Sequence, residues 1–132
     1  MNALFADTSY YVALLAEADT RHKAAVRWSR AATRIVLTDC VVLELGNSLA
    51  RSRWRTLFPE LIQDLRGDPL VEVVPLSRGL LDAGLSLYAE RPDKEWSLAD
   101  CIAFAVMKEK DITEALTADH HFEQAGFKAL LR

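Results

Sequence analysis

The sequence predicts an α/β protein with a central, mostly parallel sheet flanked by helices. Short apolar or β-branched segments alternate along the chain with longer segments of helical periodicity, which is typical of βαβ units. The chain has 132 residues, a length that suits one domain spanning residues 1–132. No repeat, low-complexity segment or linker interrupts the alternation.

The N-terminal half is expected to contain two strands and four helices. The first strand is an apolar run that Asp7 ends, and the second is a short β-branched segment. Each helix has apolar residues at helical spacing; Thr20 is the expected N-cap of the second, and Gly67 and Pro69 stop the fourth. In order, the elements are strand 2–6, helix 9–16, helix 20–32, strand 34–38, helix 39–52 and helix 54–66.

The C-terminal half is expected to contain three strands and three helices. Ser77 and Ser97 are the expected N-caps of the first two helices, and Gly126 follows the last helix. The strands are short, as in a compact α/β domain. In order, the elements are strand 71–74, helix 77–89, helix 97–108, strand 115–118, helix 120–125 and an edge strand 128–131.

Four acidic residues are expected to meet at one edge of this sheet. Asp7 ends the first strand, Asp119 ends strand 115–118, and strand 34–38 leads into the helix that carries Glu44. In open parallel sheets, functional sites lie beyond the carboxyl ends of the strands. Asp100 is the one acid in the otherwise apolar segment that follows Ser97, so its charge needs a partner or a raised pKa.

Each acid also has an ordinary structural explanation, and the sequence leaves it open. Ser97 and Asp100 match a capping box, which explains Asp100 without any ligand. Asp7 and Asp119 are suited to cap the helices that follow them. Glu44 shares a helix face with polar residues and fits a solvated surface.

If the four acids do share a cleft, they must be protonated or hold a cation, because like charges repel strongly in a partly dry site. Oxygen ligands suit a hard ion, Mg²⁺ or Mn²⁺. Such an ion lowers the pKa of a bound water and stabilises charge on a phosphodiester. Five residues with hydroxyl groups lie beside the acids in the sequence: Thr8, Ser9, Thr38, Ser97 and Thr117. They suit either of two roles, orientation of the carboxylates or ordinary turn and cap chemistry.

Arg51, Arg53 and Arg55 place three positive charges around Trp54, which suits either contact with a phosphate backbone or a solvated surface. His120 and His121 follow Asp119 and suit either a general-acid role or the protein surface. The net charge of −3 provides no global attraction to nucleic acid.

Several functional classes find no support in the sequence. Motifs for zinc proteases, P-loop NTPases, dinucleotide binding and serine hydrolases are missing. No apolar run approaches the roughly 20 residues that span a bilayer, and no signal peptide is recognisable. The expectation is a cytoplasmic protein without membrane contact.

Four segments carry a resemblance to a known family: FADTSYYVAL near the start, TDCVVLE at 38–44, WSLADC at 96–101 and LTADHHFEQAGF at 116–127. On these segments the chain resembles the PIN-domain nucleases, and within them the VapC-type toxins of bacterial toxin–antitoxin pairs. The resemblance covers essentially the whole chain, and the last two segments together are its most specific part.

The resemblance implies a PIN-like three-layer sandwich and an Mg²⁺- or Mn²⁺-dependent endoribonuclease, the toxin of a type II pair. It also implies an RNA substrate, a homodimer and a cognate antitoxin that enters or covers the cleft. The acids that match the family's metal-binding and catalytic positions are Asp7, Glu44, Asp100 and Asp119. Thr8, Ser97 and Thr117 match its supporting polar positions.

Two other functions remain as alternatives. One is a catalytically silent PIN-like interaction protein, which the intact set of four acids disfavours. The other is an Mg²⁺-binding signalling module of the phosphoacceptor type. That module needs paired acids at the end of the first strand, where this chain has Thr8 and Ser9 after Asp7, and a lysine near its last strand.

Overall fold

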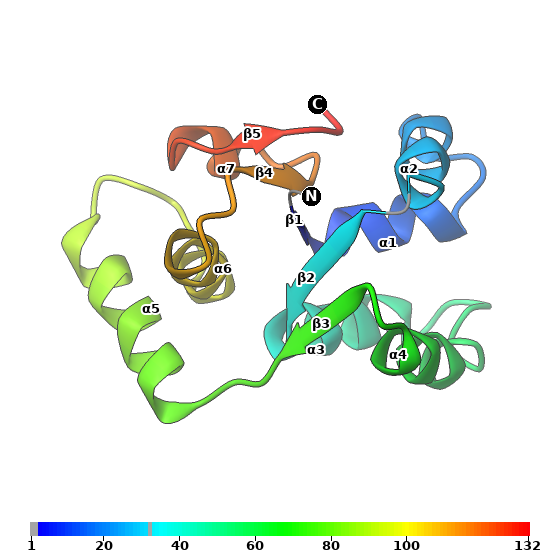
Figure 1. Ribbon diagram of the computed structural model, residues 1–132, viewed down its shortest axis with the longest axis horizontal. Helices are drawn as coiled ribbons and strands as arrows, with labels where there is room; N and C mark the ends of the chain where they lie inside the picture. Colours follow the sequence, from blue (N-terminus) through cyan, green and yellow to red (C-terminus); the bar gives the residue numbers. More distant parts are fainter. Residues whose placement is uncertain (1–2, 32) are drawn as a thin grey trace.

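A computed structural model describes residues 3–31 and 33–132. Its single sheet has five strands in the order β3-β2-β1-β4-β5, and every neighbouring pair is parallel (Figure 1). The predicted α/β class with a parallel sheet is therefore confirmed. The strands are β1 Ala3–Ala6, β2 Arg34–Thr38, β3 Val71–Val74, β4 Glu114–Leu116 and β5 Lys128–Ala129.

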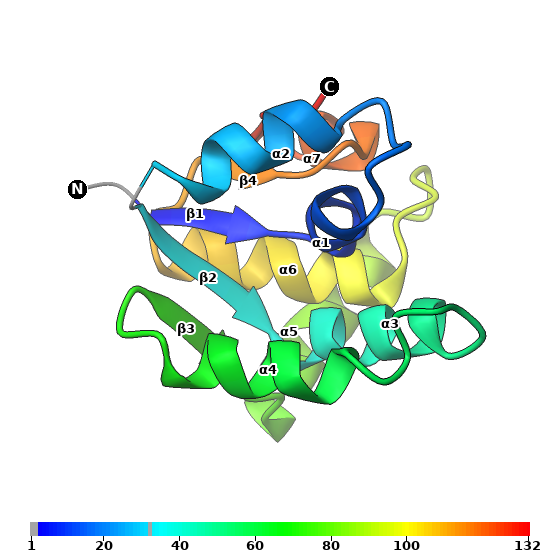
Figure 2. The ribbon, with the colours of Figure 1, turned by 90° about the vertical axis from the view of Figure 1, so that its right-hand side faces the viewer.

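Helices cover both faces of the sheet, which gives three layers. In Figures 1 and 2, α1, α2 and α4 lie on one side of the strands, and α5 and α6 lie on the other. The helices are α1 Thr8–Leu15, α2 His22–Ser29, α3 Asp39–Leu49, α4 Phe58–Gly67, α5 Arg78–Glu90, α6 Leu98–Glu109 and α7 His120–Gln124. None of the described helices combines the length and apolar character that a membrane crossing needs.

Helix α6 is the central packing element on its side of the sheet. Its buried residues occur at nearly every position from Cys101 to Met107, as the apolar segment predicts. Phe104 packs edge-on against both Trp96 and Phe122, with ring centroids 5.1 and 5.0 Å apart. On its outer side α6 meets α5 closely, because a Cβ added at Gly84 would lie 2.5 Å from Ile102 Cγ1. This packing fixes where the N-terminus of α6, and hence Asp100, is held.

Two predicted helix starts are wrong. Helix α2 begins at His22, and Thr20 does not cap it; the Arg21 N–H instead donates to Asp19 Oδ1 at 2.8 Å, in a turn before the helix. Helix α4 begins at Phe58 rather than at residue 54. The residues before it form turns, and a proline in its first turn favours that later start.

Two strands are shorter than predicted. Strand β4 ends at Leu116 instead of residue 118, and β5 ends at Ala129 instead of residue 131. Thr117, just past the end of β4, is buried and uses its side chain to bind Asp7. Asn2 and Ala32, the ends of two predicted elements, lie outside the described residues.

Candidate functional site

Asp7 lies where β1 passes into α1, at the carboxyl edge of the sheet. It occupies the N-cap position of α1, but its side chain makes no capping hydrogen bond. Its Oδ2 instead accepts a hydrogen bond from the Thr117 hydroxyl at 2.8 Å, and its backbone N–H donates to Leu116 O at 3.1 Å. The capping explanation of Asp7 is wrong, because its side chain makes no capping hydrogen bond and instead binds Thr117, just past the end of β4.

Asp100 is both a cap and a member of the acidic cluster. The Asp100 N–H donates to Ser97 Oγ at 3.0 Å, and the Ser97 N–H donates to Asp100 Oδ2 at 3.2 Å, which confirms the predicted capping box. The same Oδ2 lies 3.2 Å from His121 Nδ1. The cap therefore orients the carboxylate toward the other acids, and the two explanations of Asp100 hold together.

Asp119 also caps a helix while it faces the cluster. Its Oδ1 accepts the His121 backbone N–H at 2.9 Å, at the start of α7. Its own N–H donates to Thr117 Oγ1 at 3.0 Å. The buried Thr117 hydroxyl thus connects Asp7 to the Asp119 backbone, so one side chain positions two of the acids.

The four acids lie within electrostatic range of one another. Burial raises the pKa of Asp7, and the charges of Asp100 and Asp119 raise it further, against the lowering effect of the Thr117 hydrogen bond. Burial raises the pKa of Asp100 as well, with a further contribution from Asp119. Glu44 is exposed on α3, yet partial desolvation raises its pKa, followed by the charges of Asp7, Asp100 and Asp119. The charges of the four acids therefore reach one another at this edge of the sheet, and their shared role as metal ligands stays a prediction.

The predicted supporting hydroxyls divide into different roles. Thr117 binds Asp7, and Ser97 holds Asp100, as described above. Thr8 follows Asp7 in the chain, and within the described residues its buried Oγ1 has no hydrogen-bond partner. Thr38 is a helix cap, because its Oγ1 accepts the Val41 N–H at 3.3 Å at the start of α3.

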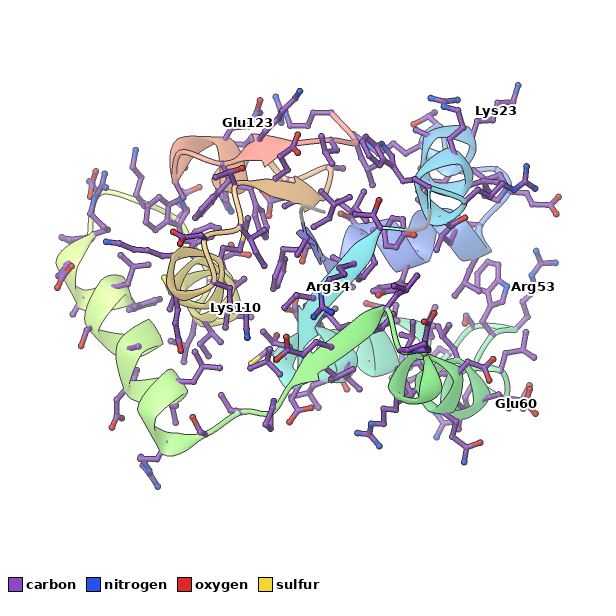
Figure 3. All side chains as sticks on the ribbon, in the orientation of Figure 1. Lys23, Arg34, Arg53, Glu60, Lys110 and Glu123 are labelled. Atoms are coloured by element: carbon purple, nitrogen blue, oxygen red, sulfur yellow. The ribbon has the colours of Figure 1, made fainter. Side chains whose placement is uncertain are left out.

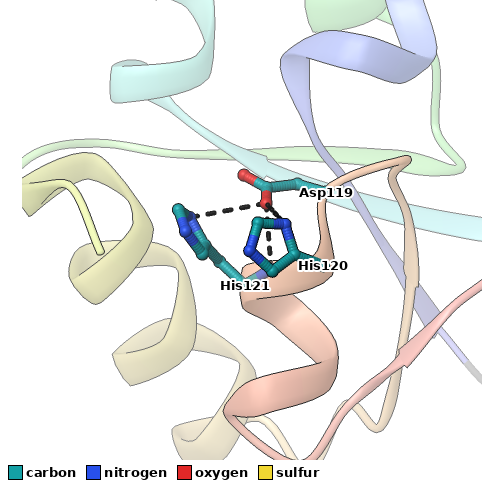
Figure 4. Close-up of side chains that lie close together, drawn as sticks. All are labelled: Asp119, His120 and His121. Atoms are coloured by element: carbon teal, nitrogen blue, oxygen red, sulfur yellow. Dashed lines mark hydrogen bonds and ion pairs between the residues drawn. The ribbon is translucent and has the colours of Figure 1, made fainter. Parts of the chain in front are cut away.

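His121 is a site residue whose role the sequence left open. Its Nδ1 lies 3.2 Å from Asp100 Oδ2 and 3.4 Å from Asp119 Oδ1, and only 18% of its side chain is exposed. His120 is 55% exposed, with its Nδ1 3.6 Å from Asp119 Oδ1 (Figure 4). The signal that could have identified His121 is its position two residues after a capping acid, which directs it back over the helix start.

The three arginines lie away from the acids. Arg51, Arg53 and Arg55 are exposed in the turn between α3 and α4, where Figure 3 shows Arg53 projecting from the molecule. The Arg53 guanidinium lies over the Trp54 ring at 4.8 Å, and Arg55 donates to Ala50 O at 2.9 Å. The turn is a basic surface segment and not part of the acidic cluster.

The donor set of the cluster fits a hard divalent cation. The carboxylates offer oxygen ligands, which Mg²⁺ and Mn²⁺ prefer. Burial, followed by the charges of neighbouring acids, raises the pKa of Asp7, Asp100 and Glu44, and a bound cation would favour their ionised forms.

A family model described as PIN domain matches residues 4–128. The chain belongs to the PIN domain family. The 23S rRNA-specific endonuclease VapC20, from two strains of Mycobacterium tuberculosis, is 29% identical to this PIN domain over 124 residues, which are 94% of this chain and 95% of the relative.

Solved structures agree with this assignment. The crystal structure of Mycobacterium tuberculosis VapC20, described as a Sarcin-Ricin loop cleaving toxin, superposes with a TM-score of 0.83 at 27% identity and covers 94% of this chain and 95% of its own. FitAcB from Neisseria gonorrhoeae superposes with a TM-score of 0.66 at 20% identity, over 96% of this chain and 94% of its own, which supports the fold. The predicted resemblance to VapC-type PIN domains is confirmed.

Proposed function

We propose that this PIN-domain protein is a metal-dependent endoribonuclease and the toxin of a type II toxin–antitoxin pair. The observation that carries the proposal is the convergence of Asp7, Glu44, Asp100 and Asp119 at one sheet edge, with raised pKa values at three of them. The similarity to VapC20, named a 23S rRNA-specific endonuclease, makes ribosomal RNA the first substrate to test.

Asp7 and Asp100 are the principal ligands for Mg²⁺ or Mn²⁺ in this proposal, and Glu44 and Asp119 complete the set. A bound ion of this kind lowers the pKa of a coordinated water and stabilises charge that builds on the phosphodiester. The Thr117 hydroxyl binds one oxygen of Asp7, and the Ser97 N–H binds one oxygen of Asp100. These two carboxylates therefore keep a fixed orientation. Glu44 is the exposed member, so it completes the set from the solvent side, directly or through water.

The basic turn supplies contacts to the RNA backbone in this proposal. Arg51, Arg53 and Arg55 carry three charges that phosphates attract, and Trp54 offers a ring for stacking. The acidic net charge of the chain leaves affinity for RNA to such local groups and to bound cations.

The proposal includes two protein partners. One is a cognate antitoxin that covers the acidic cluster, as the similarity to a VapC toxin suggests. The other is a second copy of this chain. Leu85 and Tyr88 of α5, 45% and 55% exposed, are apolar surface that a homodimer could bury. Sedimentation equilibrium of the wild type and of Leu85→Glu tests the second point: loss of dimer in the variant supports this surface, and an unchanged mass excludes it.

Cleavage of purified ribosomal RNA tests the enzymatic proposal. We expect wild-type protein to cut with Mg²⁺ or Mn²⁺ and to be inactive with EDTA. Asp7→Asn should lose activity, because it removes a charge from the ligand set while it keeps the side-chain shape. Asp111→Asn is the matched control, since Asp111 is exposed and has φ 55°, a conformation that asparagine tolerates. Equal activity in wild type and Asp7→Asn would favour the silent interaction protein or a contaminant.

A further inference from the structure

One group of metal-ligating side chains is not explained by an all-carboxylate centre. Asp119, His120 and His121 each offer a ligand atom, and these atoms lie within 4.8 Å of one another. We propose that these three residues form a nitrogen-containing arm of the metal centre, which binds a borderline transition ion such as Zn²⁺ or Co²⁺ in preference to Mg²⁺. The inference rests on the proposed function because Asp119 is a ligand both in the proposed carboxylate centre and in this arm.

The start of α7 fixes the geometry of the arm. The Asp119 carboxylate is held at the helix N-cap by the His121 backbone N–H, and the Asp119 backbone is held by Thr117. The two imidazoles come from the first two residues of the helix, and both lie beside that carboxylate (Figure 4). Their ring centroids are 4.4 Å apart with an interplanar angle of 49°. The oxygen ligand is therefore preorganised, with both nitrogen donors next to it.

Two of the three separations are close to those around a single ion. His121 Nδ1 and His120 Nδ1 lie 3.4 and 3.6 Å from Asp119 Oδ1. Two ligands bound at about 2.1 Å to a tetrahedral ion stand about 3.4 Å apart. Binding of all three atoms to one ion requires side-chain rotation, and the His120 side chain, which is 55% exposed, has solvent space in which to rotate.

The chemistry of the donors selects the ion. Imidazole nitrogen suits Zn²⁺, Co²⁺ and similar ions, whereas Mg²⁺ favours carboxylate, carbonyl and water oxygen. An ion can reach the arm from solvent, since the Asp119 side chain is 32% exposed. His121 Nδ1 is also 3.2 Å from Asp100 Oδ2, so the arm adjoins the carboxylate cluster. The centre as a whole then has two parts. The part around Asp7 has only oxygen ligands and suits a hard ion, and the part around His121 has nitrogen ligands and suits a borderline ion.

Imidazole ¹⁵N NMR tests this assignment directly. The chain has three histidines, so three ring systems appear in the spectrum of the tag-free protein. We expect one equivalent of Zn²⁺, added in excess Mg²⁺, to shift ring nitrogens of His120 and His121. His22 is the internal control, because its Nδ1 is 2.7 Å from Ala13 O on another part of the fold. Mg²⁺ alone should leave all three rings without a coordination shift.

Calorimetric titration of Zn²⁺ in excess Mg²⁺ gives the second measurement. His120→Gln and His121→Gln should each weaken Zn²⁺ binding by at least roughly tenfold, whereas His22→Gln should leave it unchanged. Unshifted His120 and His121 nitrogens, an unchanged Zn²⁺ affinity in the double variant His120→Gln/His121→Gln, or no Zn²⁺ binding at all would each overturn the inference. The Mg²⁺-dependent RNA cleavage of the wild type is scored separately, so failure of the arm is distinguishable from failure of the proposed function.

Discussion

The hydroxyl of Thr117 holds the carboxylate cluster together, and its removal has a calculable cost. Thr117 is fully buried; it donates to Asp7 Oδ2 at 2.8 Å and accepts the Asp119 N–H at 3.0 Å. Thr117→Val keeps the shape and deletes both bonds, together with a longer contact of 3.4 Å to Ser9 Oγ. A hydrogen bond to a charged group contributes about 1.5–3 kcal/mol, and a buried N–H left unpaired adds to the loss. We expect the free energy of unfolding to fall by about 2–3 kcal/mol.

Chemical denaturation in EDTA measures this change, with exposed Thr113→Val as the matched control. In thermal melts, the melting temperature should fall by roughly 5–10 °C for Thr117→Val and should hardly change for Thr113→Val. A double-mutant cycle with Asp7→Asn isolates the bond, because a neutral partner reduces its contribution to about 1 kcal/mol. A coupling energy near zero, or a loss below about 0.5 kcal/mol for Thr117→Val, would refute the role given to this hydroxyl.

Three more predictions address the electrostatics, the packing and the RNA surface. Because the pKa of Asp7 is raised in the folded state, the metal-free protein should lose stability as pH rises from the unfolded carboxyl pKa of about 4 through the higher folded pKa. Asp7→Asn should flatten this pH dependence of the free energy of unfolding, measured in urea titrations. An unchanged pH dependence in the variant would contradict the prediction. Gly84→Ala should destabilise the protein by about 1–3 kcal/mol, since its Cβ would lie 2.5 Å from Ile102 Cγ1, whereas thermal melts of exposed Gly67→Ala should show little change. Arg53→Ala should lower the salt dependence of RNA binding measured by fluorescence anisotropy, by about one unit of slope if the residue contacts a phosphate; an unchanged slope would assign it to the solvated surface.

The sheet could be predicted from the sequence because each strand carries its own local signal. Strand 34–38 and strand 71–74 have the predicted bounds, and both are short segments rich in valine, isoleucine or leucine. The predicted strand extends past the true end of β4 because threonine is β-branched and common in strands. The Thr117 side chain instead turns to Asp7, a tertiary contact more than 100 residues away in sequence.

The site was predictable in its acids and less so in its histidines. Topology places the ends of β1 and β4 side by side, so Asp7 and Asp119 follow from the order of the elements. For Asp100, capping and clustering appeared to be competing explanations, and the structure joins them in one carboxylate. The position of His121 two residues after Asp119 is a local signal, but its contact with Asp100 depends on how α7 packs beside α6, which no local pattern of residues specifies.

The most direct test of the cation site is a calorimetric titration of Mn²⁺ into three proteins: wild type, Asp7→Asn and the control Asp111→Asn. Saturable binding is expected in the wild type and the control, and binding at least roughly tenfold weaker is expected in Asp7→Asn. The same titration followed by thermal melts should show stabilisation by Mn²⁺ wherever it binds. Equal Mn²⁺ affinity in all three proteins would contradict the assignment of the carboxylate cluster as the metal centre.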